Sequence, residues 1–133
     1  MSEIAEILEA KERLRAGGAA DSEKINIAEE ALGLKFANDY TEYLKAFGFA
    51  SYKGHELTGL CNSARLNVTD VTVEARELYD LASDMYVIEE TGYEGILILQ
   101  DTKGNIYHIE PASKPEKIFS SLADYIQNEQ FNP

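Results

Sequence analysis

The spacing of apolar residues changes near Met85, and this change limits the folds that the chain can adopt. Before that point, apolar residues recur three and four positions apart, which is the period of an amphipathic helix. After it come MYVIE, GILILQ and NIYHIE, which are short runs typical of strands. Helices followed by strands predict an α+β domain in which N-terminal helices pack on a mainly antiparallel sheet, with one more helix at the C-terminus.

Two helices are expected in the first third of the chain. Apolar spacing predicts the first over residues 2–15, ended by the Gly-Gly pair that follows. In the second, Asn26 and Glu29 have the spacing of a capping box, and Gly33 fits the position just after the helix. The residues expected on its apolar face are Ile27, Ala31 and Leu32.

The third helix has the clearest apolar face in the sequence. Asn38 can cap it and Gly48 can end it. The residues that recur between them at helical spacing are Tyr40, Tyr43, Leu44 and Phe47. A fourth helix is expected to open at Thr69 or Asp70. The residues expected on its inner face are Val71, Ala75, Leu78 and Ala82.

The remaining elements are predicted to be strands and a final helix. Two short strands are expected on either side of Gly54. The ILIL run is apolar on both faces, which predicts a central strand, and DTKGN is expected to form the next hairpin loop. Ser121 and Asp124 form a capping box for the last helix. Its expected buried residues are Leu122, Tyr125 and Ile126.

Size, charge and cysteine content limit the class of protein. A chain of 133 residues is expected to form one domain, residues 1–133, with a core that needs no disulfide or metal. Cys61 is the single cysteine, and no secretory or membrane-spanning segment is recognisable, so we expect a cytoplasmic protein. The net charge of −12 repels nucleic acids and anionic membranes but attracts basic proteins. The sequence does not set the oligomeric state.

The negative charge is concentrated in one stretch of the chain. Residues 70–94 hold eight acidic residues and a single basic one, Arg76. Positions 70, 74, 77 and 84 recur at steps that align on one face of a helix, which predicts an acidic stripe facing water. The alternative is that the charge serves solubility alone. The candidate partner-binding residues are Asp70, Glu74, Glu77, Asp80, Asp84, Glu89, Glu90 and Glu94.

Catalytic and metal-binding patterns are weak in this sequence. A hydrolase would need Cys61 beside a base, and only His55 and His108 are available. His108 and Glu110 match the H-x-E part of the zinc deaminase motif, but P-C-x-x-C is missing. The Gly-rich phosphate-binding motifs are missing as well. We therefore expect no catalytic residue, metal or cofactor, and keep a Cys/His hydrolase as the less favoured alternative.

Four segments of the chain resemble the SUKH superfamily. They span Ile25 to Gln127 and read IAEEALGLKFANDYTEYLKAFG, ELTGL, the GNIY hairpin and SSLADYI. Ala37 stands where members of the family usually have proline. Glu29 is the one polar residue singled out among the matching positions, and its predicted place in the capping box explains why it is there. The resemblance implies a small α+β domain that binds another protein. Many bacterial members are immunity proteins that neutralise a cognate toxin, often a nuclease, and a fungal branch includes cell-wall assembly regulators. We expect an immunity protein, with a regulatory scaffold as the alternative.

Overall fold

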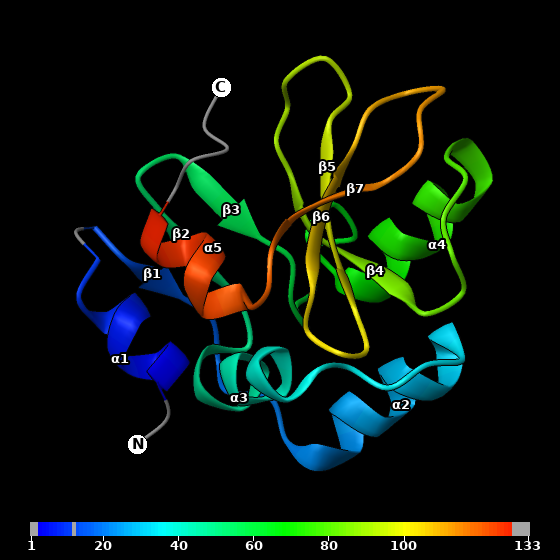
Figure 1. Cartoon of the computed structure of the whole chain (residues 1–133). Helices are drawn as coiled ribbons and strands as arrows, with labels where there is room; N and C mark the ends of the chain where they lie inside the picture. Colours follow the sequence, from blue (N-terminus) through cyan, green and yellow to red (C-terminus); the bar gives the residue numbers. More distant parts are fainter. Residues whose placement is uncertain (1–2, 12, 129–133) are drawn as a thin grey trace.

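A seven-stranded sheet runs through the molecule, with helices on both of its faces (Figure 1). The structure is a computed structural model and describes residues 3–11 and 13–128. Each strand pairs with the next one in the sequence, and every pair is antiparallel. The elements in chain order are α1 (Glu3–Glu9), β1 (Arg15–Ala16), α2 (Ser22–Leu32), α3 (Asn38–Phe47), β2 (Ala50–Tyr52), β3 (His55–Leu57), α4 (Val68–Leu78), β4 (Met85–Glu90), β5 (Leu97–Asp101), β6 (Ile106–Ile109), β7 (Glu116–Phe119) and α5 (Leu122–Asn128). The predicted α+β class is confirmed.

The sheet separates two apolar cores. Tyr86 and Ile88 of β4 join the larger core, which also takes in the buried sides of α1, α2, α3 and α5. Met85 and Val87 point the other way, into a smaller core under α4. This alternation is what the pleat of a strand requires. Strand β5 is buried along its whole length and lies between β4 and β6, so the predicted central strand is confirmed.

Helix α3 matches its prediction except at its first residue. The four residues expected to face the core are all buried, and Gly48 ends the helix with a φ of 69°. The N-cap is Ala37 rather than Asn38, and its side chain cannot cap the helix. The Ala37 N–H instead donates to the buried Tyr86 hydroxyl at 3.0 Å. Proline, which the family usually has at this position, could not make this hydrogen bond because it has no N–H.

Helix α1 ends much earlier than the predicted residue 15. Arg13 has a φ of 59°, a left-handed conformation that interrupts a right-handed helix. The chain then becomes strand β1, in which Arg15 pairs with Ser51 and Ala16 with Ala50. This pairing with β2, far along the chain, replaces the last turn of the expected helix.

Helix α2 begins before its predicted start, at Asp21. The Asp21 carboxylate accepts a hydrogen bond from the backbone N–H of Lys24 at 2.9 Å and caps the helix. The capping box assigned to Asn26 and Glu29 is therefore wrong, because both residues lie inside the helix. Glu29 is buried and accepts from the N–H of Phe36 at 2.8 Å, which fixes the loop after the helix.

The apolar face predicted for α2 is also largely wrong. Ile27 is 59% exposed and Ala31 is exposed, whereas Leu32 is buried as expected. The helix packs through Ile25 and Ala28 instead. Gly33 ends the helix in the left-handed conformation, with a φ of 70°, as predicted.

The β5–β6 hairpin is held by one carboxylate, that of Asp101. It accepts hydrogen bonds from the backbone N–H groups of Lys103 and Asn105 at 3.0 and 2.9 Å, and from the Tyr107 hydroxyl at 2.9 Å. Burial alone would raise the pKa of Asp101, but the hydrogen bonds from Asn105 and Tyr107 outweigh it and lower that pKa. The predicted hairpin loop is confirmed.

Replacing Leu44 by alanine is expected to lower the free energy of unfolding by about 2–5 kcal/mol, because the side chain is fully buried and its loss leaves a cavity. Leu78→Ala is the matched control: this leucine is also helical but 69% exposed, so a change within about 0.5 kcal/mol is expected. Urea denaturation measures both. Similar losses for the two variants would contradict the burial that separates them.

Candidate functional site

Helix α4 carries the acidic residues on which the sequence analysis concentrated. It lies against β4 at one side of the molecule (Figure 1). Asn67 caps it by accepting from the N–H of Thr69 at 3.0 Å, so the helix opens slightly before the predicted Thr69 or Asp70. Its buried side consists of Val68, Val71, Thr72 and Ala75. The Thr72 hydroxyl accepts from the N–H of Val87 at 3.0 Å, which fixes the helix on the sheet.

Three of the predicted acidic residues form a stripe on the outer side of α4. Asp70, Glu74 and Glu77 are exposed and follow one another at helical steps of four and three. Asp80 and Asp84 are exposed too, but the helix has ended before them, at Leu78. The alignment of Asp84 with the stripe is therefore wrong, because helical spacing no longer applies beyond that point.

The apolar side predicted for α4 is wrong at its C-terminal end. Leu78 is 69% exposed, and Ala82 is exposed and lies outside the helix. The cause is the early end of the helix: Tyr79 has extended backbone, with φ −129° and ψ 157°, so no further turn continues the buried face. Leu78 and Val73, which is 45% exposed, therefore add apolar surface beside the acidic stripe.

The β4–β5 loop lies next to the end of α4. The Tyr79 hydroxyl donates to the carbonyl of Gly95 and fixes the loop to the end of the helix. This loop carries Tyr93, which is 51% exposed, and the exposed Glu94. Sequence reasoning placed Glu94 in the candidate site but missed Val73 and Tyr93. Apolar periodicity predicts which side chains are buried, and it does not show which exposed apolar side chains lie beside the carboxylates.

Glu89 does not belong to the acidic surface, contrary to the prediction. It is only 4% exposed, and its carboxylate bonds with the His55 Nδ1 at 2.9 Å and accepts from the Tyr125 hydroxyl at 2.6 Å. A bulge in β4 between Val87 and Glu89 explains this, since an extra residue reverses the alternation of the strand. Glu89 thus points towards α5 rather than towards α4.

Glu90, the next residue, lies close to α4. Burial raises the pKa of Glu90, the nearby Glu74 raises it further, and Arg65 partly offsets both. Arg65 is itself engaged with both oxygens of Glu56, at 2.9 and 3.2 Å. Repulsion between Glu74 and Glu90 is thus only partly relieved within the chain.

The outer side of α4, Glu90 and the β4–β5 loop together form the candidate binding surface, which we name the acidic face. It consists of Asp70, Val73, Glu74, Glu77, Leu78, Glu90, Tyr93 and Glu94.

The candidate nucleophile and bases have separate partners. Cys61 is half-buried in the loop before α4, and its Sγ contacts the Ser63 carbonyl oxygen at 3.7 Å. His55 is buried against Glu89, and the Nε2 of His108 pairs with Glu116 at 3.2 Å. Over residues 3–11 and 13–128, no group of three or more histidine, cysteine, aspartate or glutamate residues is arranged to hold a metal ion. Over the same residues, no helix is long and apolar enough to cross a membrane.

A model of the SMI1-KNR4 cell-wall family, SUKH_5, matches residues 1–131. The chain belongs to this SUKH family. The resemblance drawn from the sequence is thereby confirmed. No curated protein matches the chain closely enough to count as a relative. A crystal structure of a protein from Pseudomonas syringae pv. tomato shows the same fold, with a TM-score of 0.77 and 16% sequence identity over 95% of this chain and 94% of that chain.

Two glycines in the segments that resemble the family support the fold. A Cβ at Gly59 would lie 2.0 Å from the Gly48 carbonyl oxygen, and a Cβ at Gly48 would lie 1.9 Å from that of Gly18. Only glycine allows these backbone segments to approach so closely. Gly48 and Gly59 therefore say nothing about the partner. The residues of the acidic face come from the charge pattern and the geometry of this chain.

Glu74→Gln is expected to lower the pKa of Glu90 by removing a nearby negative charge. The pKa of Glu90 in the folded chain lies above its unfolded value, so the free energy of unfolding falls as the pH rises from the unfolded pKa to the folded one. The substitution should make this fall smaller. NMR titration of the side-chain carboxyl carbons measures the shift. Glu77→Gln is the control, since Glu77 does not contribute to the pKa of Glu90, and an equal shift in both variants would contradict the geometry.

Proposed function

We propose that this SUKH protein is an immunity protein that binds and neutralises a cognate toxin protein through the acidic face. The observation that carries the proposal is the row of Asp70, Glu74 and Glu77, exposed on a helix whose other side is buried in the core. Exposed like charges on neighbouring turns repel each other and do not stabilise the free fold. A basic partner would relieve that repulsion.

The apolar residues of the acidic face support binding to a protein rather than to small cations. Leu78, Val73 and Tyr93 are three of the four large apolar residues that are strongly exposed in the described part of the chain. Protein interfaces commonly combine a few buried apolar anchors with a charged rim. On the acidic face the carboxylates would steer the partner, and the apolar side chains would be covered when it docks.

A nuclease is a suitable class of toxin for such a surface. Proteins that bind nucleic acid carry clusters of lysine and arginine that neutralise phosphates. An acidic surface of similar charge density can occupy the same cluster and exclude the nucleic acid. The net charge of −12 adds long-range attraction to a basic toxin and speeds its capture. Action on a toxin made in the same cell would place the protein in the cytoplasm.

Reversing two charges of the acidic face, Glu74→Lys with Glu77→Lys, is expected to weaken toxin binding about tenfold or more at low salt, a change of about 1.4 kcal/mol. The loss should shrink at high salt because exposed charges are screened. Titration calorimetry at both salt concentrations measures it. Glu9→Lys with Glu42→Lys is the matched control, since it changes the net charge equally at exposed sites on α1 and α3. Equal weakening by both pairs would show that only total charge matters.

The alternative function is a regulatory scaffold of the cell-wall assembly type, which the family also includes. Both functions require a protein partner, and they differ in what the partner does. A toxin gene beside the gene for this chain, with survival of toxin-expressing cells that depends on the chain, favours the immunity function. Binding without protection favours the scaffold.

We propose further that neutralisation involves no catalysis by this chain. Cys61→Ala with His108→Ala is expected to leave protection of toxin-expressing cells unchanged, because neither residue belongs to the acidic face. His55 is kept, since its removal would take a hydrogen-bond partner from the buried Glu89 and destabilise the fold. Cell survival and a thermal melt measure the two properties. A variant that stays folded but no longer protects would restore the hydrolase hypothesis.

A further inference from the structure

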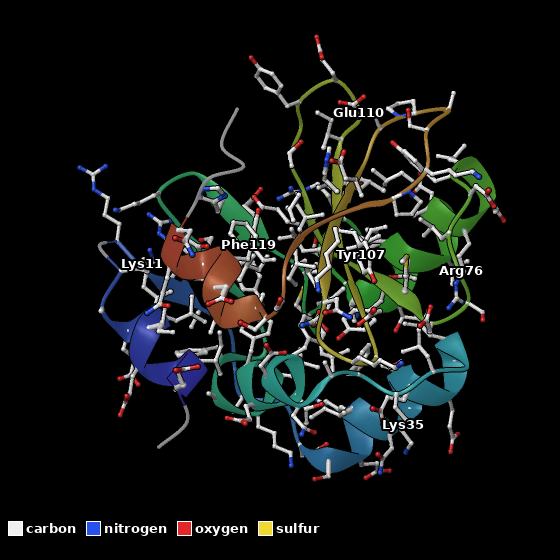
Figure 2. The ribbon with its side chains drawn as sticks, viewed as in Figure 1. Lys11, Lys35, Arg76, Tyr107, Glu110 and Phe119 are labelled. Carbon is white, nitrogen blue, oxygen red and sulfur yellow. The ribbon has the colours of Figure 1, made fainter. Side chains whose placement is uncertain are left out.

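Four cations gather at the corner of the molecule opposite the acidic face. They lie on the segment after α1, on the edge strand β1 and in the β2–β3 turn, and they are Lys11, Arg13, Arg15 and Lys53. Figure 1 shows β1 and α4 on opposite sides of the molecule. Figure 2 likewise places Lys11 on the far side from Arg76 of α4. The chain has only twelve basic residues against twenty-four acidic ones, so four at one corner form a distinct patch.

Two adjoining hollows connect these cations. Lys11 and Lys53 line one of about 590 Å³, together with Glu6 and Gln127. Lys53 also lines the other, of about 520 Å³, with Arg13 and Arg15. Lys53 thus lines both hollows, and we name the surface formed by the four cations the basic corner.

Three of the four cations of the basic corner are not engaged by acidic groups among the described residues. Glu56 borders the second hollow, but both of its carboxylate oxygens bind Arg65. Within the part of the chain that the structure describes, Arg13, Arg15 and Lys53 make no ion pair. Glu6 is the acidic residue that lines the first hollow among the residues that the structure describes. The basic corner therefore retains charge that an anionic partner can use.

The backbone displays these cations in a defined way. Arg13 and Lys53 have φ values of 59° and 47°, in the left-handed region that residues other than glycine seldom adopt. The pairing of Arg15 with Ser51 and the tight β2–β3 turn hold these conformations in place. Such unfavourable conformations are retained where the surrounding structure enforces them, often at binding sites.

Protection of the sheet edge explains only part of this patch. Charged residues on an edge strand prevent unwanted pairing with other chains, and Arg15 on β1 can serve this purpose. Lys11 and Lys53 lie outside β1, so they do not guard its edge. Strand β1 has only two residues, and both are exposed. An extended segment could lie along this short edge with its acidic side chains among the four cations.

We propose that the basic corner is a second docking surface, which binds an extended acidic segment of a partner protein. Charge complementarity supports this occupant, and the open edge of β1 suits an extended chain. The proposal does not depend on the acidic face, since the two surfaces lie apart.

The test uses a fluorescently labelled peptide of ten glutamates as the probe and the full chain as the receptor. Fluorescence anisotropy at low salt is expected to show binding to the native protein. Arg15→Glu with Lys53→Glu should weaken it about tenfold or more. Lys45→Glu with Lys114→Glu is the matched control: both lysines are exposed and lie outside the basic corner, and the change in net charge is equal. The control should bind like the native protein.

A second measurement locates the binding and separates other outcomes. Backbone NMR shifts on adding the peptide should concentrate in residues 13–16 and 51–54. Arg15→Gln with Lys53→Gln, which removes charge without reversing it, should weaken binding in the same direction if the reversed variant fails to fold. Absence of binding to the native protein, equal weakening by the control, or tighter binding of a ten-nucleotide single-stranded DNA at the same residues would each overturn the proposal.

Discussion

Strand β5 has no exposed face, and this constraint determines how the rest of the chain is arranged. A strand buried on both sides requires apolar cover above and below the sheet. Helices α1, α3 and α5 supply it on one side, and α4 supplies it on the other. Because α4 must turn its apolar side towards the sheet, its carboxylates must face water. The acidic face is thus a consequence of how the centre of the sheet is covered.

Several polar groups at the larger core are joined in a network, and such pairing is needed because unpaired buried polar groups are costly. Tyr86 donates to Gln100 at 2.6 Å, and Gln100 donates to Asp39 at 2.9 Å. Asp39 also accepts from the backbone N–H of Leu122 at 2.7 Å, at the start of α5. Burial raises the pKa of Tyr86 well above its usual value, so its hydroxyl remains a donor at physiological pH. One network therefore positions α3, the sheet and α5 relative to each other.

The two charged surfaces lie on different parts of the sheet, one at its first strand and one at its middle strand. The acidic face is built on β4 and α4, and the basic corner on β1 and the β2–β3 turn. Between them, Arg65 pairs with Glu56, and the buried Glu89 shares a hydrogen bond with His55, so these groups are engaged within the chain. The charges that lack such partners remain on the two surfaces. This separation allows one partner to be steered by carboxylates and an acidic segment to be held elsewhere without mutual interference.

Local sequence signals determined the elements whose stability depends on neighbours in the chain. The apolar period placed α3, short strand-like runs placed β4, β5 and β6, and the glycines at positions 33 and 48 marked two helix ends. The charge count located α4 as the acidic element. These signals act within one or two turns or along one strand, so they can be recognised without knowing the fold. Strands β1 and β7 were not predicted, since they form only by pairing with distant segments.

Tertiary structure alone decided which of the candidate residues reach the surface. Glu89 and Glu90 are adjacent and chemically identical, yet a bulge turns one into the core and leaves the other beside α4. Leu78 fits the apolar face of a longer helix, but the helix ends there and leaves it exposed. The sequence thus determined most of the secondary structure and the concentration of charge. The exposure of each side chain depended on packing between segments distant in the chain, and local spacing carries no information about such packing.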